Sequence, residues 1–299
     1  MTTLTERPTQ RPQQPHPSPG SARRHRRKRE RPNYLAGVSG WVWLAVIILP
    51  LYYVVVTSFK SQAGFFASNP LLPAADPTFD NYALVLNAGF LTYLLNSVIV
   101  TAGAVVPALL VSFMAAYAIV RGRGRFISMT NTIFLMGLAI PLQATIVPIY
   151  LIITKMGLYD SLLALILPSA AFALPISVLI LSNFMRDIPS ELFESMRLDG
   201  ASNWAILWHL VLPMTRPAVV TVGIYNALQV WNGFLFPLIL TQSPDKRVLP
   251  LSLWAFQGEF SINVPAILAS VVLSTVPLLV LYIFGRRQLL GGLTAGFSK

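Results

Sequence analysis

Residues 191–219, ELFESMRLDGASNWAILWHLVLPMTRPAV, form an amphipathic stretch between two long apolar runs. It contains two glutamates, an Asp-Gly turn and two tryptophans. The whole chain of 299 residues is 55% hydrophobic and only 11% charged, whereas soluble domains contain about 25% charged residues. This composition indicates a membrane protein. An amphipathic insert of this length between two apolar runs therefore needs an explanation.

Six windows without charged residues predict six transmembrane helices, because an ionised side chain near the bilayer centre costs at least about 2.5 kcal/mol. Each window can hold a span of roughly 20 residues, and we expect the second span to begin near Phe90. The windows are residues 32–59, 81–120, 126–154, 161–185, 217–244 and 260–285. The predicted fold is an all-α membrane protein with the insert, residues 186–217, between helices four and five.

The distribution of Lys and Arg predicts the orientation of this fold. With six spans, 18 of the 22 basic residues lie on the side of the two termini. The other side has only Lys60, Lys155, Lys246 and Arg247. The positive-inside rule therefore predicts that both termini and the insert face the cytoplasm.

Residues 1–33 differ in composition from the rest of the chain. They are rich in Pro, Gln, Ser and Arg and include the run RRHRRKRER at residues 23–31. Such a segment buries too little apolar surface to fold alone, so we expect a disordered basic cytoplasmic tail that contacts membrane lipid. The run has no interleaved aromatic residues, and no nucleic-acid binding is expected. Residues 34–299 then form a single membrane domain.

Motifs for catalysis, metal binding and nucleotide binding are absent from the sequence. It has no phosphate-binding loop, no H-E-x-x-H, no cysteine and no Cys/His cluster, so we expect no enzyme activity, cofactor or metal. The GVSG at residues 37–40 matches the serine motif of intramembrane proteases, but no histidine lies in a window to act as its base. The histidines are His16, His25 and His209.

The predicted spans contain no ionisable residue that could relay protons, which favours a neutral, hydrogen-bonding solute. Amides offer both donors and acceptors, and aromatic rings can stack on an apolar face of a solute. The predicted substrate path consists of Gln143, Asn226, Gln229, Trp231 and Asn232, with Asn96, Ser97, Thr145 and Phe234 as further polar or aromatic candidates. The alternative for each amide is a hydrogen bond that joins two helices.

Start and stop signals in the insert predict two short helices. Asp187 or Ser190 can cap the first helix, and Gly200 can end it in the left-handed conformation. Ser202 can cap the second helix, which we expect Pro213 to stop.

The two predicted helices are amphipathic. In the first, Leu192, Phe193 and Met196 share one side and the acids Glu191 and Glu194, with Ser195, lie largely opposite. The apolar stripe of the second helix consists of Trp204, Leu207, Trp208 and Val211. Helices this short cannot span a bilayer, and membrane-surface anchors favour basic polar faces. The acids of the first helix therefore favour docking to a partner protein over an interfacial anchor.

Several motifs, in order, resemble those of the membrane subunits of binding-protein-dependent ABC importers. Glu194-Ser-Met-x-x-Asp199-Gly200-Ala201, followed by Leu212-Pro213 and Pro217, resembles the E-A-A-x-x-x-G signature. The segments IPLQATIVPIYLIITKMGLYDSLLALILP, WNGFLFPLIL and RRQLLGGLTAGFSK resemble the carbohydrate-uptake branch, close to the second permease subunit of maltose-type systems. The resemblance covers about residues 37–299, and Ser195-Met196 replaces the usual paired alanines.

The resemblance implies a multi-pass permease subunit in a prokaryotic cell membrane. Such subunits pair with a second, homologous permease and two ATP-hydrolysing subunits, and an extracytoplasmic binding protein delivers the sugar. The residues implied to couple the permease to an ATPase are Glu191, Glu194, Ser195, Met196, Asp199, Gly200 and Ala201. Glu194 is expected to meet a basic residue there.

Other interpretations remain open at this point. The signature marks the coupling machinery, so the solute could be a glycerol phosphate, a polyol or another compound. A secondary transporter would be expected to show inverted repeats and intramembrane charges, and the latter are missing from the predicted spans. A membrane receptor or scaffold that does not transport would not need Gln143, Asn226 and Asn232 to face a common interior.

Overall fold

The computed structural model describes residues 34–256 and 262–295, and the basic tail, with its two histidines, lies outside these ranges. Most described residues are helical, and no β-strand occurs among them. The chain divides into two units, residues 1–47 and 48–299. The arrangement given below is that of the second unit.

The longest helices match the predicted windows. They are α1 Tyr34–Ser58, α4 Phe90–Arg121, α7 Leu162–Arg186, α10 Leu212–Trp231 and α13 Val264–Ala295. The helix α4 begins at Phe90, the residue expected from the sequence. Each of these helices forms in a long apolar run. In lipid, a helix pairs the backbone N–H and C=O groups within the segment itself.

Among the described residues, four helical stretches are long and apolar enough to cross a membrane. A fifth span exists if the bent pair Arg125–Gly137 and Leu142–Lys155 counts as one. The apolar stretch Val264–Val280 of α13 is shorter. The prediction of six spans therefore stays a prediction.

The third predicted window is bent by 100° rather than straight. The helix α5, Arg125–Gly137, ends before Pro141, whose backbone is extended, and the chain resumes as η1 Leu142–Thr145 and α6 Ile146–Lys155. A residue that precedes proline avoids the helical region, which explains the break at Ile140.

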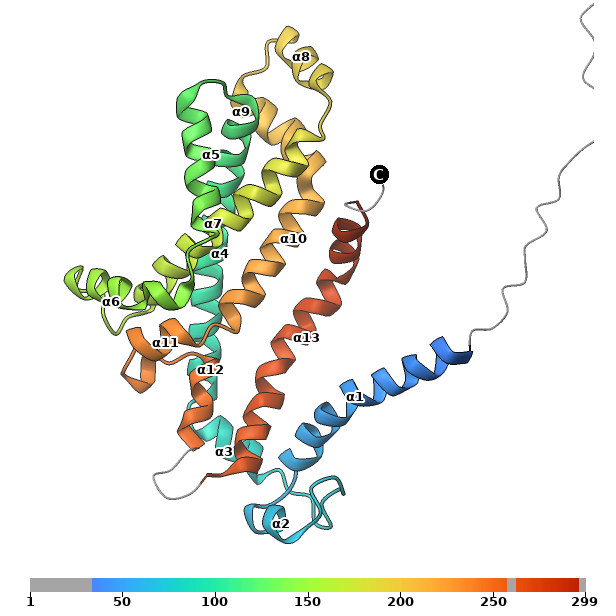
Figure 1. The fold of residues 1–299 in the computed structure, drawn as a ribbon. Helices are drawn as coiled ribbons and strands as arrows, with labels where there is room; N and C mark the ends of the chain where they lie inside the picture. The colour runs from blue at the N-terminus through green and yellow to red at the C-terminus, as the bar shows by residue number, and fades with distance from the viewer. Residues whose placement is uncertain (1–33, 257–261, 296–299) are drawn as a thin grey trace, which may run out of the picture. The chain divides into compact units, whose positions relative to one another are not determined.

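Shorter elements lie at the two ends of this unit. Figure 1 shows α8, Ser190–Leu198, at one end and α2, Gln62–Ala67, with α3, Asp80–Asn87, at the opposite end. The remaining elements are α9 Asn203–Ile206, the π-helix η2 Leu207–Val211, α11 Leu235–Leu240, η3 Pro244–Lys246, α12 Leu249–Ser252 and η4 Leu253–Phe256.

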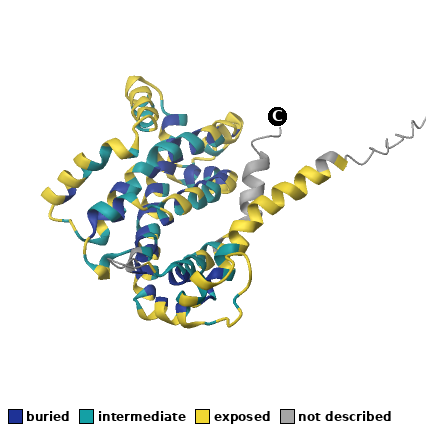
Figure 2. Cartoon of the chain, turned by 60° about the horizontal axis from the view of Figure 1, so that its bottom comes forward, coloured by how far each residue is buried: buried dark blue, intermediate teal, exposed yellow. Residues whose placement is uncertain are grey.

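The centre of the fold is the contact between α4 and α7, the most extensive between any two elements. It is close at Gly103, where a Cβ atom would lie 2.8 Å from Cδ1 of Ile166. The buried residues of α4 include the polar Asn96, Ser97 and Ser112 beside apolar ones such as Phe113, whereas other apolar side chains of this helix, such as Leu95, are exposed. Figure 2 shows exposed residues along the outer faces of the helices. This pattern suits helices surrounded by lipid or by partner helices.

The second helix of the insert does not stop at Pro213, contrary to the sequence prediction. The stretch Asn203–Trp231 forms one helical span that passes through the π-turn η2. Pro213 is the second residue of α10, directly after the π-turn, where the hydrogen-bond pattern of the helix already changes. The N-cap position of α8 is Pro189, one residue before Ser190, and the side chain of Pro189 makes no capping hydrogen bond.

We predict that Gly103→Val destabilises the protein by about 1–3 kcal/mol, because the added carbons overlap Ile166 across the α4–α7 contact. The midpoint of thermal unfolding of the detergent-purified protein measures this. Ile166→Ala should restore part of the loss in the double variant. Ala102→Val, the neighbouring exposed position on α4, is the matched control and should change the midpoint little.

Candidate functional site

The helix α8 projects from one end of the unit and exposes most of the residues that the sequence assigned to coupling (Figure 1). The exposed residues of this set are Glu191, Glu194, Ser195, Asp199 and Gly200. Met196 and Ala201 are partly buried against the cluster beneath α8. The exposed face also contains apolar side chains, since Leu192 is 38% and Leu198 is 88% exposed. A surface that mixes acids with exposed leucines is suited to protein contact.

The geometry of the turn that ends α8 explains why a glycine occupies position 200. Gly200 has a φ of +80°, in the left-handed region. Its N–H donates to the carbonyl of Arg197 at 3.0 Å, and the N–H of Ala201 donates to the carbonyl of Met196 at 2.9 Å. These two bonds form a Schellman motif, which satisfies the last carbonyls of the helix. The sequence prediction of a left-handed glycine at this position is confirmed.

One aromatic ring anchors α8 to the rest of the protein. Phe193 is 2% exposed and packs in a cluster with residues of α4, α7 and η2. The guanidinium carbon of Arg121, the last residue of α4, lies 4.0 Å from the centre of this ring. Sequence reasoning counted Arg121 only as a positive charge, because the two residues are 72 positions apart and no local pattern links them.

The second insert helix leads directly into a predicted span. Ser202 caps it by accepting a hydrogen bond from the N–H of Ala205 at 3.2 Å, as the sequence predicts. Of the predicted apolar stripe, Leu207 and Val211 are buried, whereas Trp204 is 58% exposed and its ring contacts that of Trp208 edge to face. The π-turn at this place is a geometry that often occurs at functional sites.

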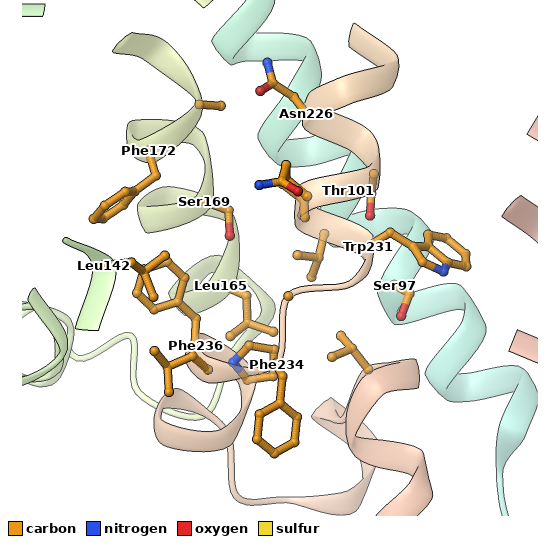
Figure 3. A pocket seen from close by; sticks show the side chains of 18 of the residues that line it. Ser97, Thr101, Leu142, Leu165, Ser169, Phe172, Asn226, Trp231, Phe234 and Phe236 are labelled. Atoms are coloured by element: carbon orange, nitrogen blue, oxygen red, sulfur yellow. The ribbon is translucent and has the colours of Figure 1, made fainter. Parts of the chain in front are cut away.

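A cavity of about 300 Å³ lies between α4, α7 and the α10–α11 segment. Figure 3 shows Ser97, Thr101 and Trp231 on its α4 side and Leu165, Ser169 and Phe172 on its α7 side. Its wall includes the break between α10 and α11, at Gly233 and Phe234. Among the residues that the structure describes, those that line it are all uncharged. The cavity therefore suits an uncharged solute with both apolar and hydrogen-bonding groups.

The structure brings together three of the five predicted path residues. Asn226, Gln229 and Trp231 line the cavity, whereas Gln143 and Asn232 do not. Gln143 is exposed in η1, and the side chain of Asn232 donates to the carbonyl of Leu228 in its own helix at 2.8 Å. Asn232 follows the last residue of α10, and Gln143 lies in η1, after the bend in the third predicted window.

The side-chain amides of Asn226 and Asn96 each make hydrogen bonds to another element of the fold, which is the alternative role considered for the amides in the sequence analysis. Asn226 donates to the hydroxyl of Ser177 on α7 at 2.7 Å, and both residues are buried. Asn96 donates to the carbonyls of Asp245 and Arg247, both at 2.8 Å, and so holds the segment after α11 against α4. Asn226 therefore lines the cavity and links two helices at once.

Several lining residues were not singled out from the sequence. Thr101, Ser169, Phe172 and Tyr225 all line the cavity, and the hydroxyl of Thr101 is buried without a hydrogen-bond partner among the described residues. Serines, threonines and aromatic residues occur throughout the apolar windows, so composition does not distinguish those that face the cavity. Their spacing along the helices did not indicate which residues face the cavity, because the sequence does not tell which helices lie next to one another.

A cluster of hydrogen bonds lies beyond the cavity, around Asp160. Its carboxylate accepts hydrogen bonds from the Ser243 hydroxyl and from the backbone N–H groups of Gln242, at 2.8 Å, and Ser243, at 3.0 Å. The N–H of Asp160 donates to the carbonyl of Leu240 at 2.9 Å. The Ser243 hydroxyl, followed by the two N–H groups, lowers the pKa of Asp160 below its usual value.

The family follows from a comparison with known proteins. Residues 86–289 match the model of the family described as "Binding-protein-dependent transport system inner membrane component". The chain belongs to this family. The match includes α4, the insert and the whole cavity wall, so the exposed helix and the cavity are parts of one transport component.

Relatives extend over most of the chain. A putative ABC transporter permease protein from Caldicellulosiruptor sp. is 41% identical, and the match covers 86% of this chain and 94% of that protein. The trehalose/maltose transport system permease protein MalG of Thermococcus litoralis is 31% identical over 88% of this chain and 95% of its own. A chain from the crystal structure of a bacterial alginate importer has the same fold, with a TM-score of 0.75, 22% identity and coverage of 85% and 95%.

We predict that Asp160 contributes to stability at neutral pH and loses this contribution in acid. Because the folded-state pKa is lowered, the contribution is present above the unfolded-state pKa and disappears as the pH falls through the folded-state pKa. Thermal unfolding of wild type and Asp160→Asn between pH 7 and pH 3 measures it. The variant should be less stable by about 1 kcal/mol at pH 7, since solvent competes for these bonds, and the two curves should converge in acid.

Ser243→Ala is the matched variant for this prediction. It removes the hydroxyl donor and keeps the carboxylate, so it should reduce the difference between neutral and acid stability without abolishing it. Parallel curves for wild type and Asp160→Asn over the whole range would contradict the role assigned to Asp160.

Proposed function

We propose that this chain is a permease subunit of a sugar-importing ABC transporter, with α8 as the helix through which an ATPase subunit drives it. The observation that carries the proposal is an exposed acidic helix, closed by a glycine turn and anchored to the spans, in a member of this transport family. In this proposal the chain supplies part of the solute path, and ATP is hydrolysed by separate subunits.

The charge distribution supports a cytoplasmic position for α8. With six spans the insert lies on the side that has 18 of the 22 basic residues. On that side it can meet an ATPase subunit, and Glu194, which is exposed on α8, can pair with a basic residue there. The closure of two ATPase subunits would move α8 and shift the balance between inward-facing and outward-facing states.

The exposed surfaces of the spans support a partner permease. On α4, apolar residues such as Leu91, Leu95 and Val106 are about half or more exposed, at 62%, 61% and 55%. These faces can contact lipid or a homologous subunit, and the wall around the cavity is only part of a path. We therefore propose a pair of permeases, two ATPase subunits and an extracytoplasmic binding protein that delivers the solute.

The cavity supports a sugar as the solute. Its wall combines aromatic rings with amide and hydroxyl groups, which suits the apolar faces and hydroxyl groups of a sugar ring. The relative from Thermococcus litoralis is named as a trehalose/maltose permease, and trehalose and maltose are both sugars. A glycerol phosphate fits less well, because none of the described residues that line the cavity is basic and could bind a phosphate. A polyol remains an alternative solute with similar chemistry.

We predict that Glu194→Lys and Gly200→Asp each lower solute uptake about tenfold or more, while the protein still inserts into the membrane. The first reverses the charge at the docking surface, and the second forces a side chain into a backbone conformation with φ of +80°. Uptake by proteoliposomes containing the complete transporter is the measurement. Asp76→Lys, an exposed charge reversal in the loop between α2 and α3, is the control. Normal uptake by both insert variants would refute the coupling role.

We predict that Gln229→Leu raises the KM for solute about tenfold, because it removes a polar group from the cavity wall. Asn232→Leu removes a bond within its own helix and should change the KM less than twofold. Uptake kinetics at a saturating concentration of binding protein separate the two variants. Equal kinetics for wild type and Gln229→Leu would show that Gln229 is only a packing residue.

A further inference from the structure

The contact between Arg121 and Phe193 joins α8 to a helix that is not its neighbour in the chain. The peptide chain links α8 to α7 through residues 187–189 and to α9 through residues 199–202. Arg121 is the last residue of α4, and its guanidinium carbon lies 4.0 Å from the centre of the Phe193 ring. This contact therefore provides a second connection from α8, independent of the backbone.

The helix α4 connects that contact to the cavity. It is continuous from Phe90 to Arg121, and Ser97, Val100 and Thr101 near its other end line the cavity. Thr101 and Arg121 lie 20 positions apart, which corresponds to about 30 Å at 1.5 Å per residue. A displacement at Arg121 can therefore reach the cavity wall along one helix, which contains Pro107 between these two residues.

The geometry at Arg121 favours the ring as the group that orients the guanidinium. Its Nε atom is buried and has no hydrogen-bond partner among the described residues. Phe193 is 2% exposed and lies in the apolar cluster with Phe113 and Ala116 of α4. A cation above an aromatic face is attracted more strongly when water is excluded, and the planar guanidinium stacks in a way that lysine does not.

We propose that Arg121 is a positioning residue for coupling, which holds Phe193 so that a movement of α8 displaces α4 and the cavity wall with it. This inference rests on the proposed function, because it requires that α8 is the helix moved by the ATPase. It adds a specific path inside the permease, from α8 through Phe193 and Arg121 to Ser97 and Thr101.

The experiment compares single and double variants in the complete transporter reconstituted in proteoliposomes. Arg121→Gln removes the charge, and Phe193→Leu removes the ring while it keeps an apolar side chain. The measured quantity is the number of solute molecules taken up per ATP hydrolysed, with the thermal midpoint recorded for each variant. Arg123→Gln, at an exposed arginine two residues further on, is the matched control.

We expect each single variant to lower the ratio of uptake to ATP hydrolysis about tenfold, with Arg123→Gln unchanged. The double variant should be no worse than either single variant, because both remove one interaction. Arg121→Lys should restore the ratio in part. A normal ratio in both single variants, or independent effects that multiply in the double variant, would overturn the proposal. A loss of thermal stability with an unchanged ratio would also overturn it, by showing that the contact only packs the fold.

A distance measurement tests the mechanical part of the proposal. The chain has no cysteine, so spin labels can be attached at Ser190→Cys on α8 and Leu95→Cys near the cavity end of α4, both exposed positions. In the wild-type background the distance between the labels should stay the same with and without ATP, because the two helices move together. Arg121→Gln should broaden the distance distribution or shift it with ATP. An identical distribution in both backgrounds would contradict the proposal.

Glu194→Lys in the same assay separates this proposal from the proposed function. If Glu194→Lys and Gly200→Asp both leave the ratio normal, α8 is not the coupling helix and the coupling role in the proposed function fails. If Glu194→Lys lowers the ratio while Arg121→Gln and Phe193→Leu do not, only the path through Arg121 is wrong.

Discussion

The requirement that backbone polar groups be paired in the absence of water governs this structure. An unpaired N–H or C=O group in hydrocarbon costs several kcal/mol, so the apolar runs form helices and depart from them only where other groups take over. One departure follows Asn232, whose N–H still makes the helical bond to the carbonyl of Leu228, while the N–H of Gly233 donates to the carbonyl of Val230 three residues earlier. That break forms part of the cavity wall. The irregular backbone therefore occurs where the protein encloses space.

The same requirement explains how polar side chains are used inside the fold. Asn96 and Asn226 make hydrogen bonds to other elements, and Asn81 donates to the carbonyls of Ser58 and Lys60, both at 2.8 Å. The buried Lys60 in turn donates to the Asn69 carbonyl at 2.8 Å. These groups connect segments that are far apart in the sequence. Gln229, Thr101 and several aromatic rings line the cavity, and they are the groups proposed to contact a solute.

The insert is connected to the cavity by two routes, of which one contains a π-turn and the other contains Pro107. One runs through Ser202 and the π-turn η2 into α10, which carries Asn226 and Gln229. The other runs through Phe193 and Arg121 into α4, which is continuous. Both routes end on the cavity wall, on helices that face each other. If a partner moves α8, the two routes can displace α4 and α10 by different amounts. The separation of these two helices would then change, which gives a physical basis for the opening and closing of a path.

The sequence alone determined the membrane class, the positions of the long helices, the start of α4 at Phe90 and the left-handed turn at Gly200. Each of these depends on neighbouring residues, through hydrophobicity, missing charges or local backbone geometry. The tertiary structure decided which amides line the cavity, the 100° bend after α5, the continuation of α10 through Pro213 and the contact of Arg121 with Phe193. These features depend on which helix faces lie together in space, and the distance between residues many positions apart is set by the packing of whole helices rather than by any local pattern.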